Sequence, residues 1–162
     1  MLEQIFSPQN LEIFGQLGLA TILGALIGVE RELARKTAGM RTFALVAMGA
    51  ALFTILSHSQ LGGPQAPVGY DPSRIASQIV VGIGFIGGGA IVFTKSQVKG
   101  LTTAAGLWVS AAIGMAVGYR FYPMAIFSTL VTIFILVFLW FMENHIIKKL
   151  GSVAARDDDG DQ

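Results

Sequence analysis

The sequence predicts an all-α protein, a polytopic transmembrane helical bundle with about five spans. Hydrophobic residues make up 53% of the 162 residues and charged residues only 13%, whereas about a quarter of the residues of a soluble domain are charged. Uncharged runs near the length of a membrane-spanning helix, about 20 residues with a lower limit of roughly 17, recur along the chain. These runs are 13–29, 42–70, 75–94, 100–119 and 121–142.

The first uncharged run is expected to be a retained membrane helix rather than a cleaved signal peptide. A signal peptide begins with a basic segment, but only Glu3 and Glu12 carry charge before this run. We expect the helix to continue past the membrane to about Lys36 and to stop at a left-handed Gly39. Thr42 would then cap the second helix.

The second and third runs are separated by turn-forming residues. The segment LGGPQAPVGY at 61–70 has the composition of a turn, so the second helix is expected to cover about 42–59. Asp71 and Pro72 then predict a helix start, because Asp caps the first turn and Pro suits the first helical position.

The last two runs predict the fourth and fifth helices. Thr102 and Thr103 open the fourth and are candidate caps, whereas Trp108 lies deep in the span and is expected to be buried. The fifth run contains no glycine and many aromatic and β-branched residues, so we expect it on the lipid-facing side. We expect residues 1–145 to form the membrane domain and residues 146–162 a disordered cytoplasmic tail.

The distribution of basic residues predicts the orientation. With five spans, nine of the eleven Lys and Arg residues fall on one side and only Arg74 and Arg120 on the other. Short loops rich in Lys and Arg stay in the cytoplasm, so the N-terminus is predicted outside and the C-terminus inside. The nine are Arg31, Arg35, Lys36, Arg41, Lys95, Lys99, Lys148, Lys149 and Arg156.

Glycines at four-residue spacing predict close packing between helices. In lipid there is little hydrophobic force between helices, so close backbone approach drives their association, and glycine permits it. An alternative for residues 82–89 is a broken helix that lines a cavity, and the sequence leaves both open. The predicted packing residues are Gly24, Gly28, Gly82, Gly84, Gly87, Gly88, Gly114 and Gly118.

Polar residues at the membrane boundaries form the candidate functional site. Glu30 and Arg41 either signal topology and contact lipid headgroups or belong to a polar site. Arg74 and Gln78 share a helix face, and Gln78 either forms a hydrogen bond between helices or belongs to a functional site. The full candidate set is Glu30, Arg31, Arg41, Thr42, Asp71, Arg74, Gln78, Thr102 and Thr103.

Several function classes have little support in the sequence. The chain has no cysteine, no Walker lysine motif and no catalytic triad, so we expect neither an enzyme nor a bound cofactor. The G-x-G-x-x-G string at 82–87 lacks the strand and the later acid of a dinucleotide site. A net charge of +1 gives no sign of nucleic-acid binding. Mg²⁺ prefers oxygen ligands, and Glu30 and Asp71 are weak candidates at opposite boundaries.

Three segments resemble the signature blocks of the MgtC/SapB family: GALIGVERELARKTAGMRTFALV, DPSRIASQIVVGIGFIGGGAIV and VKGLTTAAGLWVSAAIGMAVG. The resemblance covers about residues 11–140. It implies a protein of the bacterial cytoplasmic membrane with about five spans, linked to growth under magnesium limitation and, in some pathogens, to survival inside host cells. It also places Gly39, Gly100 and Trp108 in the polar signature, beside the candidate set.

The resemblance implies two possible functions. Members are often labelled magnesium transporters, but the family-level picture favours accessory or regulatory proteins that act on other membrane machinery. We expect such a module here, bound to the lipid bilayer and to another membrane protein or a second copy, with direct transport of Mg²⁺ or another small ion as the alternative. A third possibility is that the 31–41 connector binds anionic lipid. Phe43 stands where the family often has His, and we expect a short form without the soluble C-terminal domain of some members.

Overall fold

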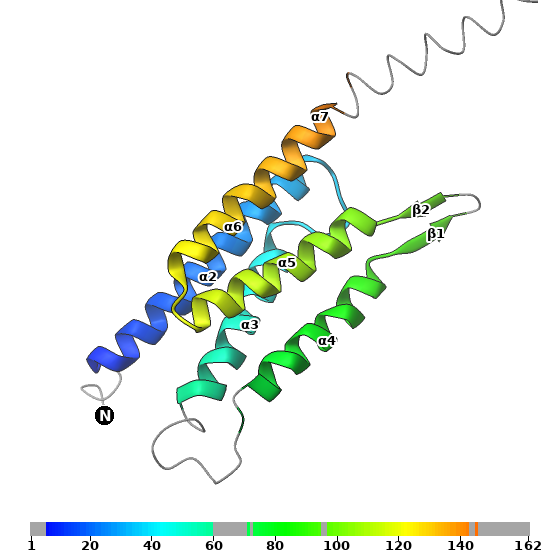
Figure 1. The fold of residues 1–162 in the computed structure, drawn as a ribbon. Helices are drawn as coiled ribbons and strands as arrows, with labels where there is room; N and C mark the ends of the chain where they lie inside the picture. Colours follow the sequence, from blue (N-terminus) through cyan, green and yellow to red (C-terminus); the bar gives the residue numbers. More distant parts are fainter. Residues whose placement is uncertain (1–5, 60–70, 72, 95–96, 143–144, 146–162) are drawn as a thin grey trace, which may run out of the picture.

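The long helices are aligned along one another in a single bundle (Figure 1). They are α2 (Pro8–Leu33), α3 (Met40–Ser59), α4 (Ser73–Gly89), α5 (Leu101–Gly118) and α6 (Tyr122–Phe134). The computed structural model describes residues 6–59, 71, 73–94, 97–142 and 145. A π-helical turn, η1 (Ile135–Leu139), and α7 (Trp140–Met142) continue α6. A two-stranded antiparallel hairpin of β1 (Val92–Thr94) and β2 (Gln97–Lys99) joins α4 to α5, with Phe93 opposite Val98. The predicted 146–162 tail lies outside the described residues.

The predicted transmembrane helical bundle is confirmed. Among the described residues, four helices are long and apolar enough to cross a membrane: Pro8–Leu33, Met40–His58, Leu101–Gly118 and Tyr122–Met142. The remaining long helix, α4, has 17 residues, which is about the lower limit for a span. The α2–α3 connector, the hairpin and α7 lie at one end of the bundle (Figure 1). The end that faces the cytoplasm stays a prediction.

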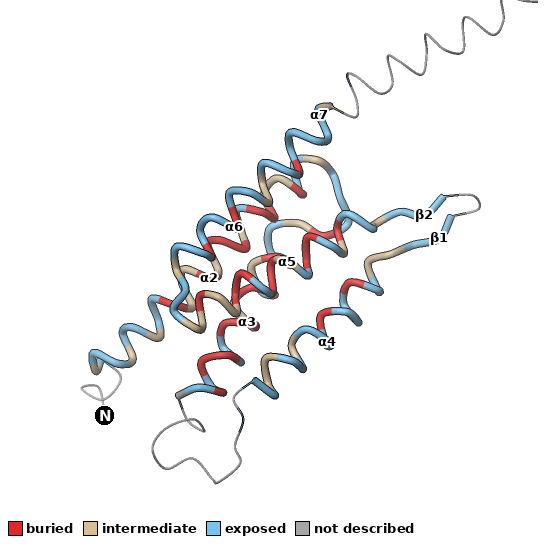
Figure 2. The backbone as a smooth tube through the Cα atoms, viewed as in Figure 1, coloured by how far each residue is buried: buried red, intermediate tan, exposed pale blue. Residues whose placement is uncertain are grey.

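The core lies between α2, α3 and α5, where the buried residues are concentrated (Figure 2). Phe43 of α3 is the largest fully buried side chain among the described residues, and Ile27 of α2 and Leu107 of α5 are buried in the same cluster. Helix α6 covers this core with few buried residues and leaves Phe127 and Leu130 exposed, as expected for a lipid-facing helix.

Close glycine packing is confirmed where α3 meets α2 and α5. A Cβ atom added to any of four glycines would lie within 3.0 Å of the neighbouring helix or its first residue, which is closer than atoms can approach without a shift. These glycines therefore set the helix separation. They are Gly24 (2.5 Å from the Phe43 carbonyl oxygen), Gly28 (2.5 Å from the Met40 Cα), Gly114 (2.0 Å from the Ala47 carbonyl oxygen) and Gly118 (2.7 Å from the Thr54 Cβ).

Helix α4 does not follow this pattern. Its buried residues are Ile83 and Gly87, and an added Cβ at Gly87 would meet Ala104 of α5 at an ordinary distance of 3.6 Å. The prediction of close packing within the chain is wrong for Gly82, Gly84 and Gly88, because an added Cβ there meets no atom within 4 Å. The helix is continuous through residues 82–89 rather than broken.

The connector between α2 and α3 differs from the prediction. Helix α2 ends at Leu33, and Arg35 rather than Gly39 is left-handed, with φ of 53°. The first backbone N–H of α3, that of Met40, donates to the Glu32 carboxylate at 3.1 Å. The Glu32 side chain therefore provides the hydrogen-bond acceptor for the first N–H of α3. Thr42 lies inside the first turn and is not the cap that was predicted.

The hairpin was not expected, because its first strand ends the uncharged run 75–94, which was interpreted as a membrane span, and its second strand follows that run. Three consecutive glycines end α4, and after Ala90 the residues 91–94 are all β-branched or aromatic, which favours extended structure. Gly100 then starts α5 as a left-handed N-cap with φ of 93°, where a Cβ would lie 2.0 Å from the Ala90 carbonyl oxygen. Thr102 and Thr103 are therefore not the caps of this helix.

Candidate functional site

The predicted polar residues do not form a single site. Glu30, Arg31, Arg41, Thr42, Thr102 and Thr103 lie at the end of the bundle that carries the hairpin, whereas Asp71 and Arg74 lie at the start of α4, at the other end (Figure 1). The two groups are separated by most of the length of α3. Gln78 lies one turn further along α4 than Arg74.

Glu30 and Arg31 form an ion pair at the end of α2. The Arg31 guanidinium donates through Nε and Nη2 to the two carboxylate oxygens of Glu30. Arg31 is 2% exposed and Glu30 is partly buried. A buried charge persists when it is paired and hydrogen-bonded, and the planar guanidinium matches a carboxylate. The Glu30 carboxylate is thus already occupied by Arg31.

Arg41 and Thr42 lie in the first turn of α3, near the same end. Arg41 is exposed, and among the described residues no carboxylate lies within 4.0 Å of its guanidinium. Thr42 is partly buried. At the start of α5, Thr102 is exposed and Thr103 is 3% exposed, so the two threonines face different surroundings.

Asp71 caps α4 as predicted. Its Oδ1 accepts a hydrogen bond from the Ser73 backbone N–H at 2.9 Å. Hydrogen bonds from the Ser73 side chain and backbone hold the pKa of Asp71 below its ordinary value of 3.8, and the nearby Arg74 guanidinium lowers it further. Arg74 and Gln78 are both exposed. Asp71 is therefore an ionised capping residue beside a cation.

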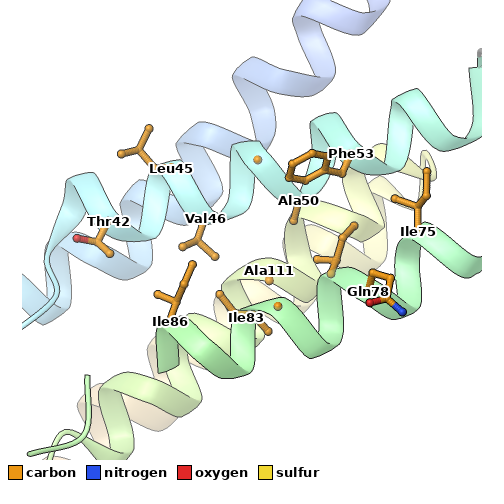
Figure 3. Close-up of a pocket in the computed structure, with 13 residues that line it drawn as sticks. Thr42, Leu45, Val46, Ala50, Phe53, Ile75, Gln78, Ile83, Ile86 and Ala111 are labelled. Atoms are coloured by element: carbon orange, nitrogen blue, oxygen red, sulfur yellow. The ribbon is translucent and has the colours of Figure 1, made fainter. Parts of the chain in front are cut away.

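A groove of about 750 Å³ runs between α3 and α4, with Ala111 of α5 at its floor. Thr42 lies at one end and Gln78 at the other, and these are the two polar side chains among its lining residues (Figure 3). The rest of the lining is aliphatic, aromatic or glycine. A smaller hollow of about 140 Å³ lies between α4 and α5, where Trp108 is 50% exposed. The expectation that Trp108 is buried is therefore wrong.

The sequence interpretation missed the groove and two buried polar contacts. Gln16 of α2 donates to the Val117 carbonyl oxygen at 3.0 Å, and Ser110 of α5 donates to the Phe43 carbonyl oxygen at 3.0 Å. Both residues are isolated polar side chains in uncharged runs, a pattern that often indicates contact between membrane helices. That pattern was the signal that could have found them.

Glu30 and Asp71, the weak candidates for a metal site, cannot share one ion. Glu30 pairs with Arg31 at one end of the bundle, and Asp71 accepts from Ser73 at the other. Within the part of the chain that the structure describes, no three His, Asp or Glu residues are close enough to hold a metal.

The sequence model of the MgtC family matches residues 17–145. This chain belongs to the MgtC family. All three signature segments lie inside the matched region, so the resemblance is confirmed. Together with its four apolar helices and its bacterial relatives, the family match identifies the chain as a bacterial membrane protein.

Three relatives illustrate the similarity of this MgtC-family chain to curated proteins. It is 45% identical over 127 residues to YhiD of Escherichia coli K12, which is provisionally named a magnesium transporter; the match covers 77% of the chain and 59% of YhiD. An uncharacterized Haemophilus influenzae protein is 42% identical over 134 residues, covering 80% and 56%. MgtC of Salmonella typhimurium LT2 is 49% identical over 112 residues, covering 69% and 46%.

The chain spans about half the length of the curated relatives that it matches. No solved structure matches the chain.

Proposed function

We propose that this chain is a non-enzymatic module of the bacterial inner membrane that supports Mg²⁺ homeostasis and adaptation to Mg²⁺ limitation by binding a partner membrane protein. The link to magnesium rests on the family and on the provisional name of YhiD. The mode of action rests on one structural observation, an open glycine face on α4.

The open glycine face is formed by Val81, Gly84 and Gly88. An added Cβ at either glycine meets no atom within 4 Å, and Val81 is 69% exposed. About 200° of helical rotation separates Gly84 from the groove residue Gly82, so this face points away from the groove. Glycines four residues apart allow a second membrane helix to approach closely, which supports binding of a partner helix here.

Affinity purification from membranes grown at low Mg²⁺, followed by mass spectrometry, tests this proposal. Gly84→Leu should lose the co-purifying membrane protein and fail to restore growth of a deletion strain at low Mg²⁺. Gly82→Leu is the matched control, since its position is equally open but faces the groove. If Gly84→Leu keeps both the partner and the growth phenotype, the proposed face is wrong.

Direct Mg²⁺ transport is the second candidate, favoured by the provisional name of YhiD as a magnesium transporter. Purified protein in sealed vesicles separates the two candidates. The accessory function predicts that the Mg²⁺ flux does not exceed the flux measured in protein-free vesicles. A robust flux that Glu30→Gln or Asp71→Asn abolishes would instead establish transport and defeat the accessory proposal.

A further inference from the structure

The groove between α3 and α4 presents hydrocarbon to the membrane interior. Its walls include Val46, Phe53 and Ile79, and it lies along the part of α3 that is apolar enough to cross a membrane. Its volume of about 750 Å³ is within the range of roughly 300–1,000 Å³ that is usual for sites that hold small molecules. The groove can therefore take a large apolar ligand from within the bilayer.

The end of the groove near Thr42 is electropositive. Arg41 is adjacent to the lining residue Thr42 and lies four residues before Leu45, so it lies beside one edge of the groove, one turn closer to the membrane boundary than Leu45. Side chains of a helix lean toward its N-terminus, which directs Arg41 outward to headgroup level. The nearby Glu32 carboxylate accepts from the Met40 backbone N–H, and among the described residues no carboxylate pairs with Arg41.

The opposite end of the groove is closer to neutral. Arg74 lies four residues before the lining residue Gln78 and occupies an equivalent position on α4. As at Arg41, no carboxylate of the described residues lies within 4.0 Å of the Arg74 guanidinium, so the difference lies in the charges around each end rather than in an ion pair. Among the described residues, and apart from the Glu30–Arg31 pair, the Arg41 end carries four cations against Glu32, whereas at the other end Arg74 and Arg120 are balanced by Asp71 and Glu12. The four are Arg35, Lys36, Arg41 and Lys99. An anionic group therefore gains more at the Arg41 end than at the Arg74 end.

We propose that this groove binds an anionic phospholipid, with an acyl chain between α3 and α4 and its phosphate beside Arg41 and the Thr42 hydroxyl. The inference goes beyond the proposed function, which concerns the opposite face of α4. The walls favour an acyl chain over a second protein helix. A close helix contact needs small residues along its length, but the open Gly49 and Gly82 alternate here with Leu45, Phe53 and Ile86. A flexible chain can follow such a surface.

Native mass spectrometry of the detergent-solubilised protein tests the apolar part of the site. The probes are dioleoyl phosphatidylglycerol, which is anionic, and dioleoyl phosphatidylcholine, which is zwitterionic. Gly82→Leu should fill the groove and lower retention of both lipids at least tenfold. Gly84→Leu is the matched control, equally open but outside the groove, and should retain both lipids at the wild-type level.

Neutralising Arg41 tests the headgroup contact. Arg41→Gln should reduce the preference for phosphatidylglycerol over phosphatidylcholine about fivefold, the factor that corresponds to the loss of one basic residue near an anionic lipid. Lys36→Gln at the same end and Arg74→Gln at the other should change it less than twofold. If Arg74→Gln has the large effect instead, the proposed orientation of the lipid is overturned.

The remaining outcomes are also decisive. Wild-type lipid retention in Gly82→Leu, or equal losses in Gly82→Leu and Gly84→Leu, would overturn the groove as a lipid site. Loss of a second copy of the chain or of a partner protein in Gly82→Leu, with lipid retained, would assign the groove to protein association and overturn the proposal. Loss of the partner in Gly84→Leu alone concerns the proposed function, so the two hypotheses can fail separately.

Discussion

Helices α4 and α5 are joined by one short hairpin, yet they are packed in opposite ways. Helix α5 has eight buried residues, spread along its length, and α4 has two. Each contains G-x-x-x-G, but Gly114 lies against the backbone of α3, whereas Gly84 faces open space. The motif therefore indicates a surface that permits close approach, and the arrangement of the helices decides whether that approach is made within the chain or remains available to another molecule.

The largest expected effect separates these two glycines directly. Gly114→Leu forces a side chain into the Ala47 backbone, where even a Cβ would lie 2.0 Å from the carbonyl oxygen. We expect a loss of about 3 kcal/mol or more in the free energy of unfolding, because overpacking against backbone cannot be relieved by rotating a side chain. Titration with SDS in mixed micelles, followed by circular dichroism, measures the loss.

The matched change on α4 is Gly84→Ala, which should be neutral or stabilise the helix by up to about 1 kcal/mol, since alanine favours a helix over glycine. Equal destabilisation by Gly114→Ala and Gly84→Ala in the same titration would mean that α4 is packed as tightly as α5, and the contrast between them would be lost.

The ion pair at the end of α2 should give the next largest effect. Glu30→Gln leaves the Arg31 guanidinium, which is 2% exposed, without a charged partner. We expect a cost of about 3 kcal/mol, at the lower end of the range for breaking a buried pair because Glu30 is partly accessible. The double change Glu30→Leu and Arg31→Leu should cost less than Glu30→Gln, because it leaves no buried charge. If the double variant loses more free energy of unfolding than Glu30→Gln, the pair contributes more than the neutralisation of a buried charge.

Gln16 should matter more than Gln78, although both are amides in apolar helices. Gln16→Leu removes hydrogen bonds to the carbonyls of Val117 and Gly118, at 3.0 and 3.4 Å, at an expected cost of about 1–2 kcal/mol. Gln78→Leu should change the free energy of unfolding by less than about 0.5 kcal/mol, because Gln78 is exposed in the groove. Similar losses for the two variants would place Gln78 in an interhelical contact after all.

The smallest effect concerns the start of α4 and depends on pH. Because the pKa of Asp71 is lowered from 3.8 in the folded protein, its stabilisation of α4 is fully present above about pH 4 and is lost as the pH falls through the folded-state value. Hydrogen exchange should show faster opening of the first turn in Asp71→Asn than in wild type at pH 6. The difference should shrink progressively as the pH is lowered below 3.8. A difference that does not shrink at all over this range would rule out the ionised carboxylate as the cause.

The number and extent of the helices were predictable because lipid imposes long uncharged runs, and these runs delimit the helices to within a few residues at most ends. The glycine contacts of α4 were not predictable, because Gly84 and Gly114 have the same local spacing and differ only in what the tertiary structure places opposite them. The first strand of the hairpin lies at the end of an uncharged run that indicated a span, although the β-branched residues there favour a strand.

The candidate site was predicted less well than the fold. Glu30 and Arg31 are adjacent in sequence, and adjacent residues do not normally face each other on a helix, so their pairing could not be predicted from spacing. Asp71 and Arg74 were correctly placed at a helix start, because the contact of the Asp71 side chain with the Ser73 backbone is local in the sequence. The groove depends on the separation of α3 and α4, which residue patterns along one helix do not report.

The 17 residues of α4 also bear on the thickness of the surrounding bilayer. At 1.5 Å per residue the helix is about 26 Å long, whereas a typical hydrocarbon layer is about 30 Å thick. A helix shorter than the layer cannot correct the mismatch by tilting, so the lipids beside α4 must thin or its flanking residues must enter the layer. The exposed Val92 and Phe93 that follow the helix are apolar enough to enter the hydrocarbon layer. The depth of α4 in the membrane therefore depends on the thickness of that layer.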